Sequence, residues 1–72
     1  MKHHIMSIVF LLGTIDYIDS GVADVEIVTS GDTVIYIELP VLIFPCKIKE
    51  GDMFYFEYID GVTEIRCGEP GE

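Results

Sequence analysis

The chain has 72 residues, half of them hydrophobic, and a formal net charge of −9 from 13 acids against 4 Lys and Arg. This length allows one domain at most, and the hydrophobic fraction argues against disorder. The charge argues against direct binding of nucleic acid, because counterion release from the phosphate backbone depends on Lys and Arg.

The first predicted element is a long strand over residues 7–18, which follows a flexible N-terminus at residues 1–6. The apolar run at residues 8–12 is too short for the core of a signal peptide and for a membrane span. We therefore expect a cytoplasmic protein that does not bind a membrane. Gly13 interrupts the strand and predicts a bend or bulge there. The apolar run before it is either buried on both faces or covered on one face by another chain.

Two shorter strands should follow as a hairpin, because two alternating segments are separated by turn residues. Asp19-Ser20-Gly21 and Ser30-Gly31-Asp32 predict the turns. The strand Val22–Thr29 places Ala23, Val25 and Ile27 on one face and Asp24 and Glu26 on the other. In the strand at residues 34–39, Ile35, Ile37 and Leu39 point one way, and Val34, Tyr36 and Glu38 point the other way.

The segment at residues 40–52 breaks the alternation, since Pro40 and Pro45 bracket four apolar residues. Proline suits the first position of a helix, so a short helical turn should begin at Pro40. Leu42, Ile43 or Phe44 would then close one end of the core. The alternative is an exposed apolar patch that binds a partner.

The last two strands, Met53–Ile59 and Val62–Cys67, flank Asp60-Gly61, a strong signal for a two-residue type I′ turn. Phe54, Phe56 and Tyr58 should share one face of the first strand; Met53, Tyr55 and Glu57 should share the other. In the second strand, Thr63, Ile65 and Cys67 alternate with Val62, Glu64 and Arg66.

Five short strands with frequent turns predict an all-β fold, a small five-stranded, partly open antiparallel barrel of the SH3-like or OB-like kind. This barrel should span residues 7–67 and be followed by a mobile acidic tail at residues 68–72. Cys46 and Cys67 are too few for a disulfide framework. We expect free, partly buried thiols, unless the fold brings the two residues together.

Four short motifs follow one another along the chain: Gly13-Thr14-Ile15-Asp16-x-Ile18, Gly21-Val22-Ala23-x-Val25-Glu26, Ile37-Glu38-Leu39-Pro40 and Ile48-Lys49-Glu50-Gly51-Asp52. Their order resembles a family of about seventy-residue bacterial and archaeal proteins known only as a domain of unknown function. The chain departs from the family at Tyr17, where a basic residue is common. The resemblance implies a small β-barrel and supplies no catalytic residues.

Carboxylates are plentiful, yet no set of residues predicts catalysis, a cofactor or a metal site. No serine lies beside a histidine, and there is no glycine-rich phosphate loop. Asp16, Asp19 and Asp24 gather around the first turn, but their spacing does not match a calcium-binding EF-hand loop. We therefore predict a protein that is not an enzyme.

The outward-facing aromatic and acidic residues predict a protein-interaction or assembly module. Tyr36, Met53 and Tyr55 should form an apolar anchor ringed by Glu38, Glu57 and Glu64. The expected partner is another protein or a second copy in a homo-oligomer. The acidic charge fits a basic protein partner, or it serves solubility alone. The alternative function is an acidic inhibitor whose rows of carboxylates (Asp24, Glu26, Glu38, Glu57 and Glu64) imitate nucleic acid and bind a basic nucleic-acid-binding protein.

Overall fold

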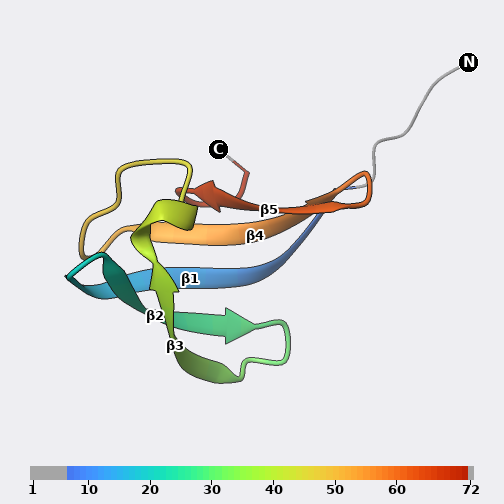
Figure 1. Cartoon of the computed structure of the whole chain (residues 1–72). Coiled ribbons are helices and arrows are strands. Elements are labelled where there is room, and N and C mark those ends of the chain that lie inside the picture. The colour runs from blue at the N-terminus through green and yellow to red at the C-terminus, as the bar shows by residue number, and fades with distance from the viewer. Residues whose placement is uncertain (1–6, 72) are drawn as a thin grey trace, which may run out of the picture.

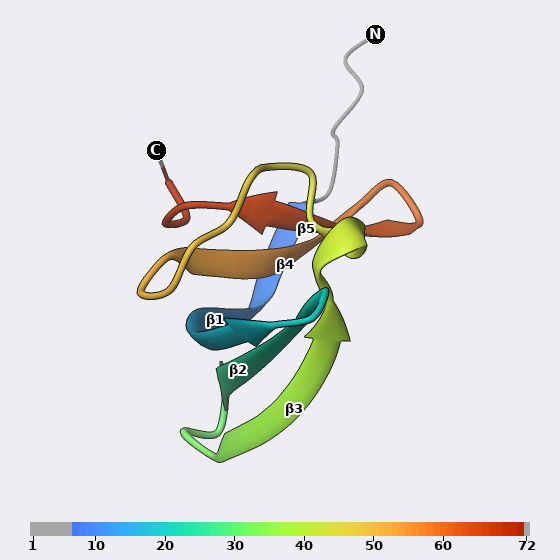
Figure 2. The ribbon, with the colours of Figure 1, turned by 60° about the vertical axis from the view of Figure 1, so that its left-hand side comes forward.

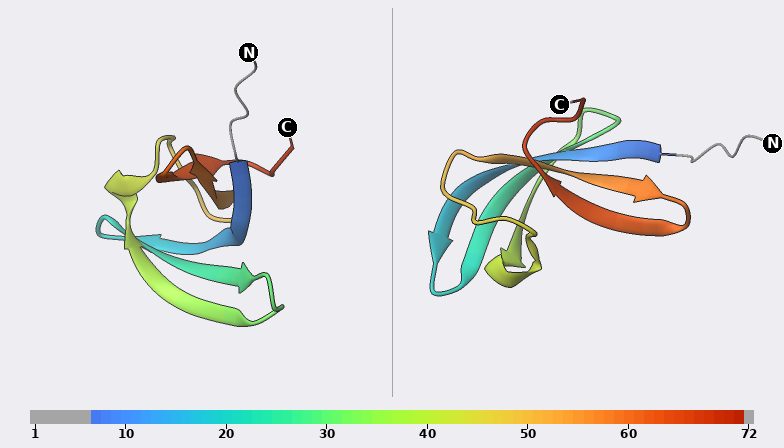
Figure 3. Two further views of the ribbon diagram at one scale, coloured as in Figure 1. Left: turned by 90° about the vertical axis from the view of Figure 1, so that its right-hand side faces the viewer. Right: turned by 90° about the horizontal axis from the view of Figure 1, so that it is seen from above.

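A computed structural model describes residues 7–71 and confirms the all-β, partly open fold (Figure 1). The elements are β1 (Ser7–Asp19), β2 (Val22–Thr29), β3 (Val34–Pro40), the 3₁₀ helix η1 (Val41–Ile43), β4 (Met53–Ile59) and β5 (Val62–Cys67). All strand pairs are antiparallel in one sheet of order β3-β2-β1-β4-β5. The sheet curls without closing, so β3 and β5 are its two edges (Figures 2 and 3). The predicted flexible N-terminus, residues 1–6, lies outside the described residues.

The central strand β1 is long and bent (Figure 3), but it has no bulge at Gly13 itself. The register shifts between Val9 and Leu11 and again between Ile15 and Tyr17, so the irregularities lie on either side of Gly13. Gly13 itself pairs regularly with Ile27 and with Phe54. The Phe54 ring occupies the space that a Gly13 side chain would need, so a Cβ at this position would overlap the ring. Glycine is therefore needed here for packing and not for a bulge.

The three predicted hairpin turns are present. Asp60 and Gly61 have φ values of 50° and 86°, as a type I′ turn requires. Ser20 and Gly21 repeat this geometry at the β1–β2 turn, with φ values of 53° and 81°. At the β2–β3 turn, the Asp32 N–H donates to the Thr29 carbonyl (3.0 Å).

The core lies on the concave face of the sheet, and its residues follow the predicted alternation. The buried residues are Ile15, Ala23, Val25, Ile27, Phe44 and Phe54. Aromatic rings link its parts: Phe44 meets Phe54 edge to face at 5.1 Å, and Phe56 lies 6.0 Å from Phe54. Leu39, Ile48 and Ile65 pack around these buried side chains.

The connection from β3 to β4 crosses from one edge of the sheet to the other half (Figures 1 and 2). It begins with the predicted helical turn, η1, whose N-cap is Pro40. Phe44 then enters the core, which confirms that one of the three apolar candidates closes it. The other two remain exposed, and Leu42 is 95% exposed.

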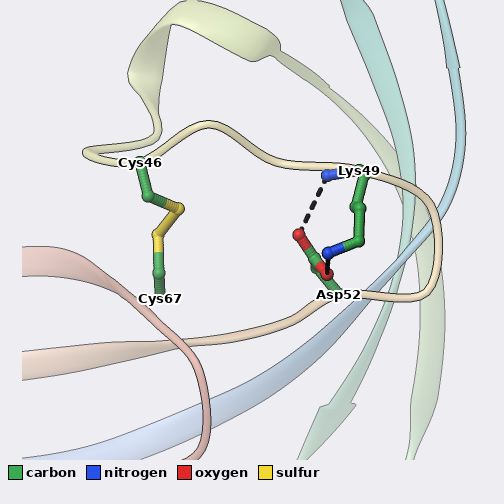
Figure 4. Close-up of polar contacts among 4 residues, drawn as sticks. All are labelled: Cys46, Lys49, Asp52 and Cys67. Carbon is green, nitrogen blue, oxygen red and sulfur yellow. Dashed lines mark hydrogen bonds and ion pairs between the residues drawn. A yellow bond between two sulfur atoms is a disulfide. The ribbon is translucent and has the colours of Figure 1, made fainter.

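The connection ends in a β-turn that is fastened to the middle of β1. The Asp52 N–H donates to the Lys49 carbonyl (3.1 Å), and the Asp52 carboxylate accepts the Lys49 N–H (2.9 Å; Figure 4). Gly51, with φ 91°, takes the position of a type II turn that favours glycine. The Gly51 N–H donates to the Ile15 carbonyl (2.8 Å), and the Ile15 N–H donates to the Asp52 carbonyl (2.9 Å). The turn therefore fixes the connection at the second irregularity of β1.

The prediction of free thiols is wrong, because Cys46 and Cys67 form a disulfide (Figure 4). Their Cα atoms lie 6.5 Å apart although 21 positions separate them in the chain. Both residues are exposed and not partly buried. The bond ties the β3–β4 connection to the end of β5, a contact that depends on the path of the connection and has no local sequence signal.

The two ends of the sheet differ in how well they are covered. Ile8, Val9 and Phe10, in the apolar run of β1, are each 36–47% exposed, so this run is not buried on both faces. The predicted mobile tail begins with a hydrogen bond from the Gly68 N–H to the Met53 carbonyl (2.8 Å), and Pro70 is half-buried. Among residues 7–71, no helix is long and apolar enough to cross a membrane.

Candidate functional site

The six residues predicted to bind a partner all lie on the convex face of the sheet, but in two separate groups. Tyr36 and Glu38 lie on β3, at one edge. Met53, Tyr55 and Glu57 lie on β4, and Glu64 lies opposite Glu57 on β5. Since β2 and β1 separate the groups, three strand spacings, roughly 14 Å, lie between them. The predicted single apolar anchor is therefore divided.

In the β4–β5 group, one arginine forms ion pairs with both acids. Glu57 and Glu64 lie directly opposite each other. Arg66 donates from Nε to Glu57 Oε1 (3.2 Å), and its Nη2 forms an ion pair with Glu64 Oε1 (2.9 Å). These carboxylates do not form a free acidic ring, because their charge is already shared with a guanidinium.

The β2–β3 group has a similar pair of facing acids, for which residues 7–71 supply no ion-pair partner. Asp24 lies directly opposite Glu38, and like charges in this position repel. Residues 14–40 contain six acids and neither Lys nor Arg. All ion pairs found between residues 7 and 71 use Lys49 or Arg66, both outside this region. The negative charge of the β2–β3 half is thus uncompensated within the described fold.

Two adjoining hollows open on this acidic half. The larger, about 380 Å³, is lined by Asp16, Tyr17, Asp24, Val25, Tyr36, Ile37 and Glu38. The smaller, about 260 Å³, shares Tyr17, Asp24 and Glu38 with it. Tyr36 is 71% exposed and Tyr17 is 55% exposed. We name the surface formed by Asp16, Tyr17, Asp24, Tyr36 and Glu38 the acidic groove.

Tyr17 and Asp16 belong to this surface although neither was predicted to bind a partner. Regular alternation from the buried Ile15 would turn Tyr17 inward. The register shift between Ile15 and Tyr17 instead pairs Tyr17 with Asp24 and returns Ile18 to the core side, opposite Ala23. The available signal was the three-residue spacing of Ile15 and Ile18, where a regular strand has a spacing of two.

An apolar row crosses the convex face beside the acidic groove. The registers place Val34, Val28, Leu12 and Tyr55 side by side on successive strands. Val34 and Leu12 are each about two-fifths exposed (42% and 41%). The row joins the two predicted groups, so an apolar contact surface continues from the acidic groove toward Tyr55.

The arrangement can attract a positively charged group. The acidic groove combines carboxylates with tyrosine rings, which attract ammonium and guanidinium groups. Within the described part of the chain, no group of three or more His, Cys, Asp or Glu side chains is placed to hold a metal ion.

Comparisons with known proteins found no match, whether to a family model, to a curated protein or to a solved structure. The resemblance to the family of unknown function therefore stays a prediction.

Proposed function

We propose that the protein is a non-enzymatic interaction module that binds a basic protein partner through the acidic groove. The observation that carries this proposal is the Asp24–Glu38 pair beside the exposed Tyr36. These two facing carboxylates form no ion pair with any described residue. A basic side chain of a partner would remove the repulsion between them. Binding is therefore favoured because it relieves the Asp24–Glu38 repulsion that is present in the free protein.

The tyrosines supply the apolar part of the contact. Tyr36 and Tyr17 present rings of large area on a rigid sheet, and tyrosine is enriched among the residues that dominate binding energy. Their ring faces also attract cations. Aromatic and acidic residues in one hollow thus favour a Lys- or Arg-bearing segment over a purely apolar partner.

The alternative, a nucleic-acid mimic, has less support from the geometry. Of its five predicted carboxylates, Asp24, Glu26 and Glu38 lie together, whereas Glu57 and Glu64 are paired with Arg66 on the other half. The row of charges is therefore interrupted. Competing DNA distinguishes the two functions, because only a mimic shares its site on the partner with nucleic acid.

The disulfide bears on the compartment in which the module works. A cytoplasmic location stays a prediction, and the Cys46–Cys67 bond weighs against it. Disulfides in small domains persist mainly in oxidising environments. Lysates for binding experiments are therefore best prepared without reductant.

The test is capture of proteins from a lysate of the source cell by immobilised protein, read by mass spectrometry. The wild type is compared with the double variant Tyr36→Ala/Glu38→Gln. Val62→Ala is the matched control, because Val62 is also surface-exposed but lies on β5, at the other edge of the sheet, and does not line the acidic groove. We expect basic partners to be lost with the double variant and kept with the control.

The same experiment identifies failure. If the double variant captures the same proteins as the wild type, the acidic groove is not the binding surface. If added DNA releases the captured protein, the mimic function replaces this proposal. Sedimentation of the protein alone reports on the predicted homo-oligomer.

A further inference from the structure

The edge strand β3 carries the same short motif as β4. On β4 this motif is paired with a neighbouring strand, β5, whereas on β3 it faces a free edge. On β3 the outward residues are Tyr36 and Glu38, with Ile37 between them facing inward. On β4 the outward residues are Tyr55 and Glu57, with Phe56 between them facing inward. Each strand therefore presents a Tyr-x-Glu motif on the convex face and apolar residues on the concave face.

On β4, the neighbouring strand β5 completes the motif with an arginine. Arg66 lies opposite Tyr55. Its guanidinium contacts Glu57, the next outward residue of β4, diagonally across the two strands (3.2 Å). Ile65, between Glu64 and Arg66, lies opposite Phe56 and packs against the core. This part of the molecule shows which strand fits a Tyr-x-Glu edge: an outward arginine beside an inward apolar residue.

The free side of β3 is geometrically equivalent to the side of β4 that pairs with β5. In this all-antiparallel sheet, β3 and β4 run in opposite directions, and their outer neighbours lie on opposite sides. Seen from the convex face, a half-turn in the plane of the sheet brings one arrangement onto the other. A strand added to β3 would therefore meet Tyr36 and Glu38 as β5 meets Tyr55 and Glu57.

The β3 edge is open to such an addition. Outside the ladder with β2, no backbone hydrogen bond in the described region involves residues 34–39. Ile35 and Ile37 face inward, yet 39% and 38% of their surface stays exposed, because the core side of the sheet is uncovered beyond β2. The strand has no lysine, no register shift and no proline before its last residue, Pro40, so these three protections do not block pairing along residues 34–39. By contrast, the disulfide and the Arg66 ion pairs protect β5.

We propose that the β3 edge binds an extended, arginine-bearing segment of the partner as a sixth strand, with the arginine opposite Tyr36 and in contact with Glu38. The inward side chain next to that arginine lies opposite Ile37 and extends the core. This inference rests on the proposed function, because it specifies how the partner's basic group reaches the acidic groove.

Charge decides between a partner segment and a second copy of this chain. Pairing of β3 with the β3 of a copy would bring two halves together that each carry six acids and no Lys or Arg. The Asp24–Glu38 repulsion would then be increased and not relieved. An arginine-bearing strand is complementary in charge, in backbone hydrogen bonding and in its apolar inner face.

The probe is a blocked hexapeptide patterned on β5, Val-Thr-Lys-Ile-Arg-Val, which replaces its acid and its cysteine. Calorimetry measures its affinity for the full chain, and hydrogen exchange by NMR reports on the β3 amides that face away from β2. We expect binding together with slower exchange of those amides. A peptide with citrulline in place of arginine should bind about three- to tenfold more weakly, because it lacks the charge that contacts Glu38 and the Tyr36 ring. A scrambled peptide of the same composition should give no protection.

Matched protein variants locate the site. Tyr36→Lys and Val62→Lys each add one positive charge to an exposed position, the first on the β3 edge and the second on the β5 edge. Tyr36→Lys should weaken peptide binding about tenfold, because it removes the ring and repels the arginine. Val62→Lys should leave the affinity within about twofold, since long-range attraction or repulsion is largely screened in salt.

The outcomes separate this inference from the proposed function. If the peptide does not bind, binds without protecting the β3 amides, or is weakened equally by both variants, strand addition is overturned. If the β3 amides become protected as the free protein is concentrated, a second copy occupies the edge, which also overturns it. Partner capture that still depends on Tyr36 and Glu38 would leave the proposed function standing in each case.

Discussion

At the scale of single residues, the closest fit in the fold is between a glycine and a phenylalanine on neighbouring strands. Gly13 and Phe54 are paired across β1 and β4, and the Phe54 ring occupies the space above the glycine. Phe54 is 1% exposed and touches Phe44 as well, so the ring has little room to move. The sequence marked Gly13 as special, but only the partner strand reveals the reason.

Gly13→Ala should therefore lower the free energy of unfolding by about 1–3 kcal/mol, the usual cost of overpacking a core. Urea unfolding measures the change. The control is the same substitution in a Phe54→Leu background, where the smaller side chain should reduce the cost. Equal losses in both backgrounds would show that the Phe54 ring is not the obstacle.

Asp52 acts through the backbone more than through its ion pair. Its carboxylate accepts the Lys49 N–H at 2.9 Å, whereas the Lys49 ammonium, 3.4 Å away, is on a side chain that is 84% exposed. Asp52→Ala should cost about 1 kcal/mol through loss of the turn hydrogen bond. Lys49→Ala keeps the N–H and should cost close to nothing, as exposed ion pairs usually do. Thermal unfolding of both variants decides this, and equal costs would contradict it.

At the scale of elements, the hairpins were predictable and the connection between them was predictable only in part. Asp60-Gly61 and the alternating residues around it determine a two-residue turn and the inward face of both strands. Pro40 likewise indicated the short helix. The path of residues 44–52 back to β1 and β5 depends on contacts between distant segments, which is why the disulfide was missed.

The disulfide should be a major part of this domain's stability. It closes a loop between positions 21 apart in the chain, for which chain entropy gives about 3 kcal/mol. Cys46→Ser/Cys67→Ser should lose this amount in urea unfolding, and the wild type in reductant should match the variant. Thiol titration of the unreduced, unfolded protein should find no free thiol. Two free thiols and an unchanged midpoint in reductant would exclude the bond.

The candidate site was also only partly predictable from strand patterns. Alternation placed all six predicted residues on the convex face, but strand order decides which of them are neighbours. No local pattern signals that β1 and β2 lie between Tyr36 and Tyr55. The irregularity at Asp16, which adds Tyr17 to the acidic groove, is a similar case.

At the scale of the whole molecule, the charge is distributed unevenly over the sheet. The three described basic residues, Lys47, Lys49 and Arg66, belong to the β3–β4 connection and to β5. The half formed by the end of β1, β2 and β3 has acids alone. This polarity opposes folding through self-repulsion and favours approach of a basic partner from one side.

Added salt should therefore raise the urea midpoint of the wild type, because it weakens the repulsion between the acids. The Debye screening length falls from about 10 Å at 0.1 M salt to about 3 Å at 1 M. The double variant Asp24→Asn/Glu38→Gln should be more stable than the wild type at low salt and gain less from added salt. An equal gain in both proteins would assign the effect to general salting-out and not to the facing acids.

The position of β1 at the centre of the sheet has a consequence for the order of folding. Three of the four strand pairs, β1–β2, β2–β3 and β4–β5, are hairpins closed by short turns. The fourth pair, β1–β4, joins distant parts of the chain: Leu12 pairs with Tyr55, 43 positions later. Bringing these strands together costs the most chain entropy and should limit the rate. Phe54→Leu should therefore slow refolding in a denaturant chevron, whereas Leu42→Ala, at an exposed position, should not. On this route, the β1–β2–β3 half and the β4–β5 hairpin form first and then dock along β1 and β4. An unchanged refolding rate for Phe54→Leu would refute it.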